Sequence, residues 1–286
     1  MIVKHDYLVE ILLATYNGEK YLTRQIESII TQTSKKWKLF IRDDGSTDGT
    51  IKIIEDYVQK YPNKINHIIS DKKNIGSTLN FSRLLENAGD NYIMFCDQDD
   101  IWLSNKIQIS MEKMIELESS QENLPCLVFS DLVVVDDDEN VISSSFWQQS
   151  RHIHSNSSDL YTIIANSMIT GCTILLNKFA KNTIKKIPTN IIQHDHWVSI
   201  IVAYFGKIGF LNEPTVLYRQ HSNNAVGSND VNFKYLFKKI FSIPKIIHDW
   251  KAAYSKLPFK VIYSRVLISK IIYNLKRLTY KNNYGK

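Results

Sequence analysis

Four polar residues, Asp97-Gln98-Asp99-Asp100, come directly after an apolar run at residues 92–96. Two carboxylates two residues apart at the end of a strand can bind one divalent cation, and Mg²⁺ or Mn²⁺ on a diphosphate prefers such hard oxygen ligands. Several acids in one turn also repel one another unless a cation neutralises them. Acidic turns are common on protein surfaces too, so this pattern alone leaves a metal site and a solvated turn as even alternatives.

A second polar cluster, DDGSTD at residues 43–48, follows another apolar run. A carboxylate there can accept hydrogen bonds from an imide N–H or from ribose hydroxyls, and the glycine lets the chain turn closely past a ligand. The alternative is a helix N-cap, a position that favours Ser, Thr and Asp. We expect Asp48 or Thr47 to cap a helix, and Asp44 or Asp43 to contact a ligand.

These clusters need elements that position them, and the first part of the chain alternates between apolar runs and amphipathic segments. Each short run of strand type is followed by polar residues and then by apolar residues at helical spacing. The alternation predicts an α/β fold with a mostly parallel, Rossmann-like sheet, whose ligands sit at the carboxyl ends of the strands. The expected strands span residues 8–14, 37–42, 66–70 and 92–96, with helices at 19–31, from 49, at 78–87 and at 104–119.

The second half of the chain contains two further runs of strand type, at residues 126–135 and 169–176. Between them, residues 143–158 are rich in Ser, His, Gln and Asn, a composition that fits an acceptor-side loop and a solvated insertion equally well. Residues 197–205 are mostly apolar and predict a buried helix that ends at Gly206.

Composition places the chain among ordinary globular proteins, since its 286 residues are 22% charged and 44% hydrophobic. Cys96, Cys126 and Cys172 lie far apart beside apolar neighbours, which predicts buried thiols in a reducing compartment. The first residues lack the pattern of a signal peptide, and no apolar stretch approaches the roughly 18 residues that span a bilayer. We therefore expect a cytoplasmic protein that meets any membrane from its surface.

Charge is distributed unevenly along the chain. There are 35 Lys and Arg against 29 Asp and Glu, a formal net charge of +6. Residues 232–286 hold 13 of these bases and a single acid, which leaves 22 bases and 28 acids in residues 1–231. An acidic body therefore precedes a strongly basic end.

The basic end contains an amphipathic pattern at residues 259–278, where apolar side chains recur at helical spacing between Lys and Arg. Such a helix favours peripheral contact with an anionic membrane, here the inner face of the cell membrane. The alternative is that its apolar stripe packs on the acidic body. A nucleic-acid partner is not expected, because the sequence contains no recognisable reading module.

Five segments, in order and spacing, resemble the family 2 inverting glycosyltransferases, which have the glycosyltransferase-A fold. The resemblance covers residues 7–228 and implies a catalytic domain over residues 1–231, with 232–286 as a basic helical extension. The matching segments are ATYNGEKYL at 14–22, IRDDGSTDGT at 41–50, KNIGSTLNF at 73–81, CDQDDIWLSNKI at 96–107 and QHDHWVSIIVAYFGKIGFLNEPTVLYRQHSNN at 193–224.

The resemblance implies a donor site for a nucleotide diphosphate sugar. Asp44 would bind the imide N–H of the base, and Asp97 and Asp99 would form the family's D-x-D pair, near the ribose and on a Mn²⁺ or Mg²⁺ ion. His221 would join the metal ligands, with an ordinary hydrogen-bonded loop residue as an equal alternative. The remaining residues implied to line the nucleotide are Thr15, Tyr16, Asn17 and Glu19 in the first loop and Asn74 and Gly76 in a later one.

The resemblance also implies a catalytic base, Asp195, at the start of a helix. In an inverting transfer the acceptor hydroxyl attacks the anomeric carbon opposite the leaving nucleotide diphosphate, and one carboxylate takes the hydroxyl proton. The simpler alternative is that Asp195 only caps its helix. On the acceptor side, His194 and His196 would orient the acceptor or reach solvent, and Trp197 would stack on a sugar or pack in the core.

Among members of the family, the motifs look most like the rhamnosyltransferase branch. This implies transfer of L-rhamnose from dTDP-rhamnose to a hydroxyl of a cell-surface polysaccharide or a lipid-linked glycan precursor. Relatives with similar motifs use a UDP-hexose or a UDP-N-acetylhexosamine, so these donors are alternatives. Two other classes compete: a metal-dependent nucleotidyltransferase, which would be expected to show a Gly-rich, Lys-bearing phosphate loop, and a catalytically silent, membrane-associated binding protein.

Overall fold

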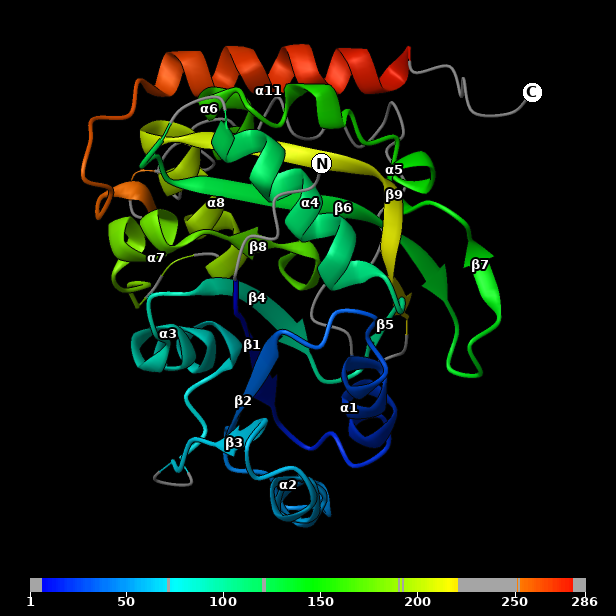
Figure 1. Cartoon of the computed structure of the whole chain (residues 1–286). Coiled ribbons are helices and arrows are strands. Elements are labelled where there is room, and N and C mark those ends of the chain that lie inside the picture. The colour runs from blue at the N-terminus through cyan, green and yellow to red at the C-terminus, as the bar shows by residue number, and fades with distance from the viewer. Residues whose placement is uncertain are drawn as a thin grey trace.

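The computed structural model describes residues 7–70, 73–119, 122–189, 191, 193–220, 251 and 253–279. Within these residues, nine strands form one sheet in the order β3-β2-β1-β4-β8-β6-β9-β5, with β7 paired to β6 (Figure 1). Helices cover both faces of this sheet. The prediction of an α/β fold with a mostly parallel sheet is confirmed, although β5, β7 and β8 run antiparallel to their partners.

The first half of the fold is a run of parallel strands joined by helices, as the sequence predicts. The N-cap residue of α2 is Gly49, so the expectation that Asp48 or Thr47 caps this helix is wrong; Asp48, one residue earlier, accepts a hydrogen bond from the backbone N–H of Thr50 through Oδ1 at 3.0 Å. The elements are β1 (Val9–Thr15), α1 (Leu22–Ile30), β2 (Trp37–Asp43), α2 (Thr50–Lys60), β3 (Ile65–His67), α3 (Ser77–Asn87) and β4 (Tyr92–Asp97).

The second half adds two long strands, β6 and β9, three short strands and further helices. Strand β8 is antiparallel to both β4 and β6, so β6 runs in the same direction as β4, and β9 pairs with β6 in parallel. The strands are β5 (Ile101–Trp102), β6 (Cys126–Val135), β7 (Val141–Ser143), β8 (Leu175–Leu176) and β9 (Lys207–Arg219). The helices are α4 (Lys106–Ser119), α5 (Phe146–Gln149), α6 (Leu160–Ala165), α7 (Lys178–Ile184), α8 (His194–Phe205) and α11 (Tyr263–Leu278), with 3-10 turns at His154–Asn156 and Gly171–Thr173.

Two apolar clusters lie on the two faces of the sheet, because alternate side chains of a strand point to opposite sides. On β1, Leu12 joins one cluster, whereas Ile11 and Leu13 join the other. The Leu12 cluster includes α3, α6, α7 and α8, and the Ile11 cluster includes α1 and α4. The three cysteines are buried and free, as predicted.

The described part of the basic end contributes to the same core as the body. Ala253, Tyr254, Leu257, Val266 and Tyr273 belong to the Leu12 cluster. Figure 1 shows α11 lying across one edge of the molecule, and its contacts are with α6. The stretch from 232 to 250 lies outside the described residues. None of the helices in the described ranges is long and apolar enough to span a membrane.

The strand expected at residues 169–176 is mostly a 3-10 turn, and only its last residues pair as β8. At Gly171 a Cβ atom would lie 2.9 Å from the His194 ring, so the chain passes very close to the start of α8. The side chains are apolar enough for a strand, but this close approach requires the local turn instead.

Candidate active site

The ends of β1, β2 and β4 lie side by side at one edge of the sheet. Thr15, the last residue of β1, pairs in register with Asp43, and Asp97 pairs with the residue before Thr15. Thr15 Oγ1 donates to Asp43 Oδ2 at 2.9 Å, and Asp43 Oδ1 accepts from the backbone of Gly45 and Ser46. Asp43 therefore holds the turn after β2 in shape, at the edge where the predicted donor residues meet.

The loop after β1 is held by side chains from neighbouring loops. Gln98 accepts from the Tyr16 backbone N–H at 2.9 Å and donates to its carbonyl oxygen at 3.0 Å. Asn17 has a left-handed φ of 47° and accepts from the Thr47 N–H at 2.8 Å, and Glu19 accepts from the N–H of the N-cap residue of α2 at 2.9 Å. The loop is thus fixed, with the side chains of Tyr16, Asn17 and Glu19 exposed. The sequence analysis did not single out Gln98. Its position between Asp97 and Asp99 is the signal that could have identified it.

Asp44 is buried, and its carboxylate holds the loop before α3. Oδ2 accepts from the Gly76 N–H at 2.8 Å, and the Ile75 N–H lies 3.0 and 3.1 Å from the two oxygens. The buried Arg42 lies 3.4 Å from Oδ1. Gly76 has a φ of 83°, a left-handed conformation that favours glycine, and Asn74 beside it is exposed. The structure therefore brings Asp44, Asn74 and Gly76 together, with the carboxylate directed at the backbone of this loop.

The turn after β4 concentrates negative charge. Burial and the charges of Asp99 and Asp195 raise the pKa of Asp97 to about 7. Burial and the charges of the same turn raise the pKa of Asp100 well above its usual range. Asp100 Oδ1 accepts from the Arg219 N–H at 3.4 Å, whereas Oδ2 has no hydrogen-bond partner among the residues that the structure describes.

This turn fits a divalent cation. Oxygens of Asp97 and Asp100 and the thiol of Cys172 lie within 4.8 Å of one another. A cation would favour the ionised form of both carboxyl groups, whose pKa values are raised without it, and would give the buried Asp100 oxygen a partner. This cluster contains Asp100, whereas the sequence predicted Asp99 as a metal ligand. Asp99 lies in the same turn, and its carbonyl oxygen accepts a hydrogen bond from Arg219 Nε at 3.1 Å.

A buried cation lies behind this turn. Lys106, at the start of α4, is fully buried, and its ammonium group donates to Thr215 Oγ1 at 3.1 Å and lies 4.8 Å from the centre of the Trp102 ring. Burial lowers its pKa to about 8, while Cys172 and Asp100 are among the groups that oppose this shift. Lys106 thus places positive charge beneath the acidic turn. Sequence reasoning missed it, because a lysine at the start of a helix ordinarily faces solvent.

Asp195 lies in the first turn of α8, and its side chain is almost wholly buried. Oδ2 accepts from the Gly171 N–H at 3.1 Å, and Oδ1 accepts from the N–H of His196 at 2.7 Å. The Asp195 carboxylate lies near enough to Asp97 for its charge to raise the pKa of that residue. The predicted base and the acidic turn therefore come together from separate elements.

The three side chains predicted for the acceptor side lie in the interior instead. His194 stacks on Phe81 with ring centres 4.0 Å apart, and its Nε2 is buried without a hydrogen-bond partner among the described residues. His196 Nε2 lies 2.8 Å from the Ile163 carbonyl oxygen, and Trp197 belongs to the Leu12 cluster. Burial lowers the pKa of both histidines. The helical periodicity of the sequence did not show that every side chain in the first turns of α8 is buried.

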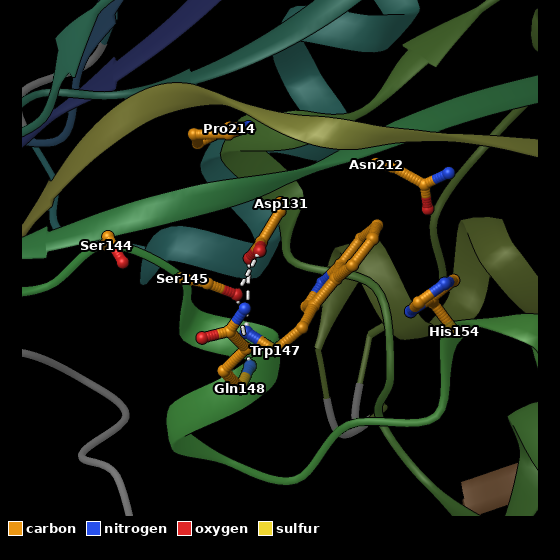
Figure 2. Close-up of a pocket in the computed structure, with 8 residues that line it drawn as sticks. All are labelled: Asp131, Ser144, Ser145, Trp147, Gln148, His154, Asn212 and Pro214. Carbon is orange, nitrogen blue, oxygen red and sulfur yellow. Dashed lines mark hydrogen bonds between the residues drawn. The ribbon is translucent and has the colours of Figure 1, made fainter. Parts of the chain in front are cut away.

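The polar segment at residues 143–158 forms a small cavity of about 180 Å³ against β6 and β9 (Figure 2). Asp131 accepts from the backbone of Trp147 at 3.1 Å and from the Ser145 hydroxyl, so its carboxylate fixes the start of α5. No described residue predicted for the donor or metal lines this cavity. Its lining residues are Asp131, Ser144, Ser145, Trp147, Gln148, His154, Asn212 and Pro214.

One predicted metal ligand, His221, lies outside the described residues, which end at 220 in this part of the chain. The strand that leads to it, β9, carries Arg219, whose Nη1 donates to the Asp137 carbonyl oxygen at 2.6 Å and whose Nη2 lies 3.3 Å from a Glu139 oxygen. Arg219 therefore joins the acidic turn to the β6–β7 hairpin.

The fold is shared with known glycosyltransferases. TarS residues 1–349 from S. aureus, solved with UDP-GlcNAc, aligns over 97% of this chain and 74% of its own, with a TM-score of 0.61 and 17% identity. The mannosyltransferase PcManGT from Pyrobaculum calidifontis, solved with GDP-Man and Mn²⁺, aligns over 98% of this chain and 77% of its own, with a TM-score of 0.57 and 13% identity. The fold is that of the glycosyltransferase-A class, as predicted.

Sequence comparison gives the family. The model of glycosyl transferase family 2 matches residues 10–125. The dTDP-rhamnosyl transferase RfbG of Shigella flexneri is 32% identical over 242 residues, 80% of this chain and 78% of that protein. The putative teichuronic acid biosynthesis glycosyltransferase TuaG of Bacillus subtilis is 27% identical over 78% of this chain and 82% of its own. The chain belongs to glycosyltransferase family 2 and is a nucleotide-sugar-dependent glycosyltransferase.

Proposed function

We propose that this enzyme transfers L-rhamnose from dTDP-rhamnose, with inversion, to a hydroxyl of a cell-surface polysaccharide or lipid-linked glycan precursor. The donor assignment is supported by the similarity to the Shigella flexneri rhamnosyl transferase across most of both chains. A UDP-hexose or UDP-N-acetylhexosamine is the alternative donor. We also propose that the basic end keeps the enzyme at the inner, anionic face of the cell membrane, close to a lipid-linked acceptor.

Each part of the site has a task in this reaction. The fixed loop at Tyr16 and Asn17 and the loop held by Asp44 offer exposed groups to the nucleotide. Asp97, Asp99 and Asp100 would hold Mn²⁺ or Mg²⁺, which supplies charge stabilisation for the leaving diphosphate when bound. These residues all lie at the carboxyl edge of β1, β2 and β4.

Asp195 would take the proton of the acceptor hydroxyl. Its Oδ2 is oriented by the Gly171 N–H, and its place in the first turn of α8 fixes the position of the carboxylate that would accept the proton. The observation that carries the proposal is the contact between Asp195 and the chain beside the acidic turn. Asp195 accepts from the Gly171 N–H, and the thiol of the next residue, Cys172, lies within 4.8 Å of oxygens of Asp97 and Asp100. A base beside the turn that holds the diphosphate is the arrangement that inverting transfer needs.

The test is the substitution Asp195→Asn, measured with dTDP-rhamnose, Mn²⁺ and a glycan acceptor. Asparagine keeps one of the two oxygens that accept from the backbone N–H groups of Gly171 and His196, but it does not accept the proton, so transfer should fall by about 10² to 10⁴ while donor binding in a thermal-shift assay is retained. The exposed Asp138→Asn serves as a control and should transfer normally. Near wild-type turnover of Asp195→Asn would refute the base assignment, and a wild-type protein without turnover on any nucleotide sugar would support the silent binding protein instead.

A further inference from the structure

Helix α11 has one face that is fixed to the body of the enzyme. Val266 is completely buried and Tyr273 nearly so. The Tyr273 hydroxyl lies 3.2 Å from His152 Nδ1, and Lys270 donates to the Ala165 carbonyl oxygen at 2.7 Å. Val266, Lys270, Tyr273 and Arg277 follow one another at spacings of three and four residues, so they share one side of the helix.

The opposite face of α11 is apolar and uncovered. Ile268 is 56% exposed, Ile271 49%, Ile272 47% and Leu275 57%. These four residues also recur at spacings of one, three and four, and they form a stripe along the helix, here called the outer stripe. Four large aliphatic side chains on one exposed helix face are costly in water, because each forfeits the free energy of burial.

The charged side chains of the described segment that carries the outer stripe are all basic, while one acid from another segment, the exposed Asp159, lies 3.5 Å from Ser269 of α11. Residues 251–279 contain five lysines, two arginines and no Asp or Glu. Arg265 and Lys276, near the two ends of α11, are exposed, and so is Lys260 before it. An apolar stripe with cations beside it is the pattern of a helix that lies in the headgroup region of an anionic bilayer.

Exposed aromatic rings lie close to the beginning of α11. Phe259 stacks on Tyr204 with ring centres 3.7 Å apart, and Tyr204 and Phe205 at the end of α8 are 47% and 39% exposed. Amphipathic aromatic side chains favour the boundary between water and lipid. Tyr204, Phe205 and Phe259 thus form a second, partly exposed apolar cluster, next to the segment that leads into α11.

We propose that the outer stripe of α11 is the membrane-contact surface of this enzyme and that its occupant is an anionic lipid bilayer. The proposal deepens the membrane location given under the proposed function and rests on it. A second copy of the chain suits the stripe less well, because a stable interface buries about 800 Å² on each partner. A bilayer takes a single narrow stripe, and it matches the charge beside it.

The contacts with α6 fix α11 to the body of the enzyme. Lys270, Tyr254 and His196 bond to the carbonyl oxygens of Ala165, Ile164 and Ile163, at the end of α6. Since His196 follows the proposed base, α6 links the membrane-contact helix to the helix of the base. The active site therefore keeps one orientation relative to the lipid surface.

The test compares the full-length protein with the double substitution Ile268→Glu/Leu275→Glu in a flotation assay with vesicles. Vesicles of phosphatidylcholine alone are compared with vesicles that also contain phosphatidylglycerol. The wild type should float with the anionic vesicles, and the double variant should bind them at least ~10-fold more weakly, since two apolar groups and the local charge balance are both lost. The matched control is Val141→Glu/Ile142→Glu on the exposed β7, which should float like the wild type.

Two further measurements separate the possible failures. Thermal denaturation with and without nucleotide sugar shows whether the outer-stripe variant is folded and binds donor. Retained donor binding with lost flotation supports the proposal, and flotation equal to that of the wild type overturns it. A wild-type dimer that the variant dissociates also overturns it in favour of a second copy. A protein that floats but transfers no sugar leaves this inference standing while the proposed function fails.

Discussion

Two regions of the molecule are held together in different ways. The donor half contains the loops at the ends of β1, β2 and β4, and the base half contains α8, which carries the proposed base. In the donor half, Asp43, Asp44 and Gln98 fix loops through hydrogen bonds to backbone groups near the ends of β1 and β2. In the other half, α8 is held by helix packing and by a remote contact from Tyr254, whose ring centre lies 6.0 Å from that of His196. We therefore expect nucleotide recognition to depend on local loops, and the position of the proposed base to depend on the remote C-terminal segment.

The largest expected effect concerns the acidic turn, and its absence would remove the metal site from the donor half. Chelation of divalent metal, or Asp99→Ala, should lower transfer about a hundredfold or more, because the diphosphate loses a charge partner. Donor affinity measured with and without Mn²⁺ should differ for the wild type and become equal in the variant. The exposed Asp138→Ala is the control. An unchanged Mn²⁺ dependence of donor affinity in Asp99→Ala would exclude Asp99 from the metal site.

A second prediction tests the local nature of the donor half. Asp44→Ala removes the acceptor of the Ile75 and Gly76 N–H groups and leaves the buried Arg42 without its carboxylate. We expect about 3 kcal/mol less stability in chemical denaturation, together with weaker donor binding. Asp44→Asn, which keeps one acceptor oxygen, should lose less. Equal stability of wild type and Asp44→Ala would show that the loop is not held in this way.

A third prediction concerns the pH dependence of stability near α11, where His152 lies beside Tyr273. Burial lowers the pKa of His152 to about 3, below the ordinary value of 6.5, so the folded protein keeps this ring neutral while the unfolded chain binds a proton. Stability from this group is complete above pH 6.5 and is lost as the pH falls toward 3, at up to about 1.4 kcal/mol per pH unit. In melting curves between pH 7.5 and 5, His152→Gln should lose less stability than the wild type. Parallel loss in both proteins would contradict this.

The smallest expected effect concerns Lys270, which joins α11 to the end of α6. Lys270→Met should cost about 1 kcal/mol in denaturation, because the part-buried ammonium group loses its hydrogen bonds to the Ala165 carbonyl oxygen and to Asn166 Oδ1. If the base half depends on the C-terminal helix, kcat should fall while donor affinity stays the same. The exposed Lys276→Met provides the comparison and should retain kcat. A change in donor affinity with unchanged kcat would contradict this, because it would mean that Lys270 affects the donor half.

Much of the donor half could be predicted from the sequence, because its strands are short apolar runs and its polar clusters follow them directly. The parallel strands and the meeting of the ends of β1, β2 and β4 came from this alternation. The sequence did not show that the Asp44 carboxylate bonds to the loop at Gly76, or that Lys106 is buried. Both depend on distances between segments that periodicity does not encode.

The base half was harder to predict for a physical reason. Side chains near a helix start can face solvent or the core, and His194 turns inward because Phe81 offers it a stacking partner. The amphipathic pattern at residues 259–278 likewise contained two apolar faces, and only the structure separates the buried face at Val266 from the exposed one at Ile268.

The three carbonyl bonds at the end of α6 have a consequence for how this enzyme opens. Ile163, Ile164 and Ala165 are each bonded from a different segment, by α8, by the stretch before α11 and by α11 itself. Local unfolding of α11 would remove the bond to the Ala165 carbonyl and expose the apolar surface that Val266 and Tyr273 bury, so opening of α6 and α11 should be coupled. In hydrogen exchange, the amides of α6, α8 and α11 should lose protection as one cooperative unit, while those of the donor strands exchange separately.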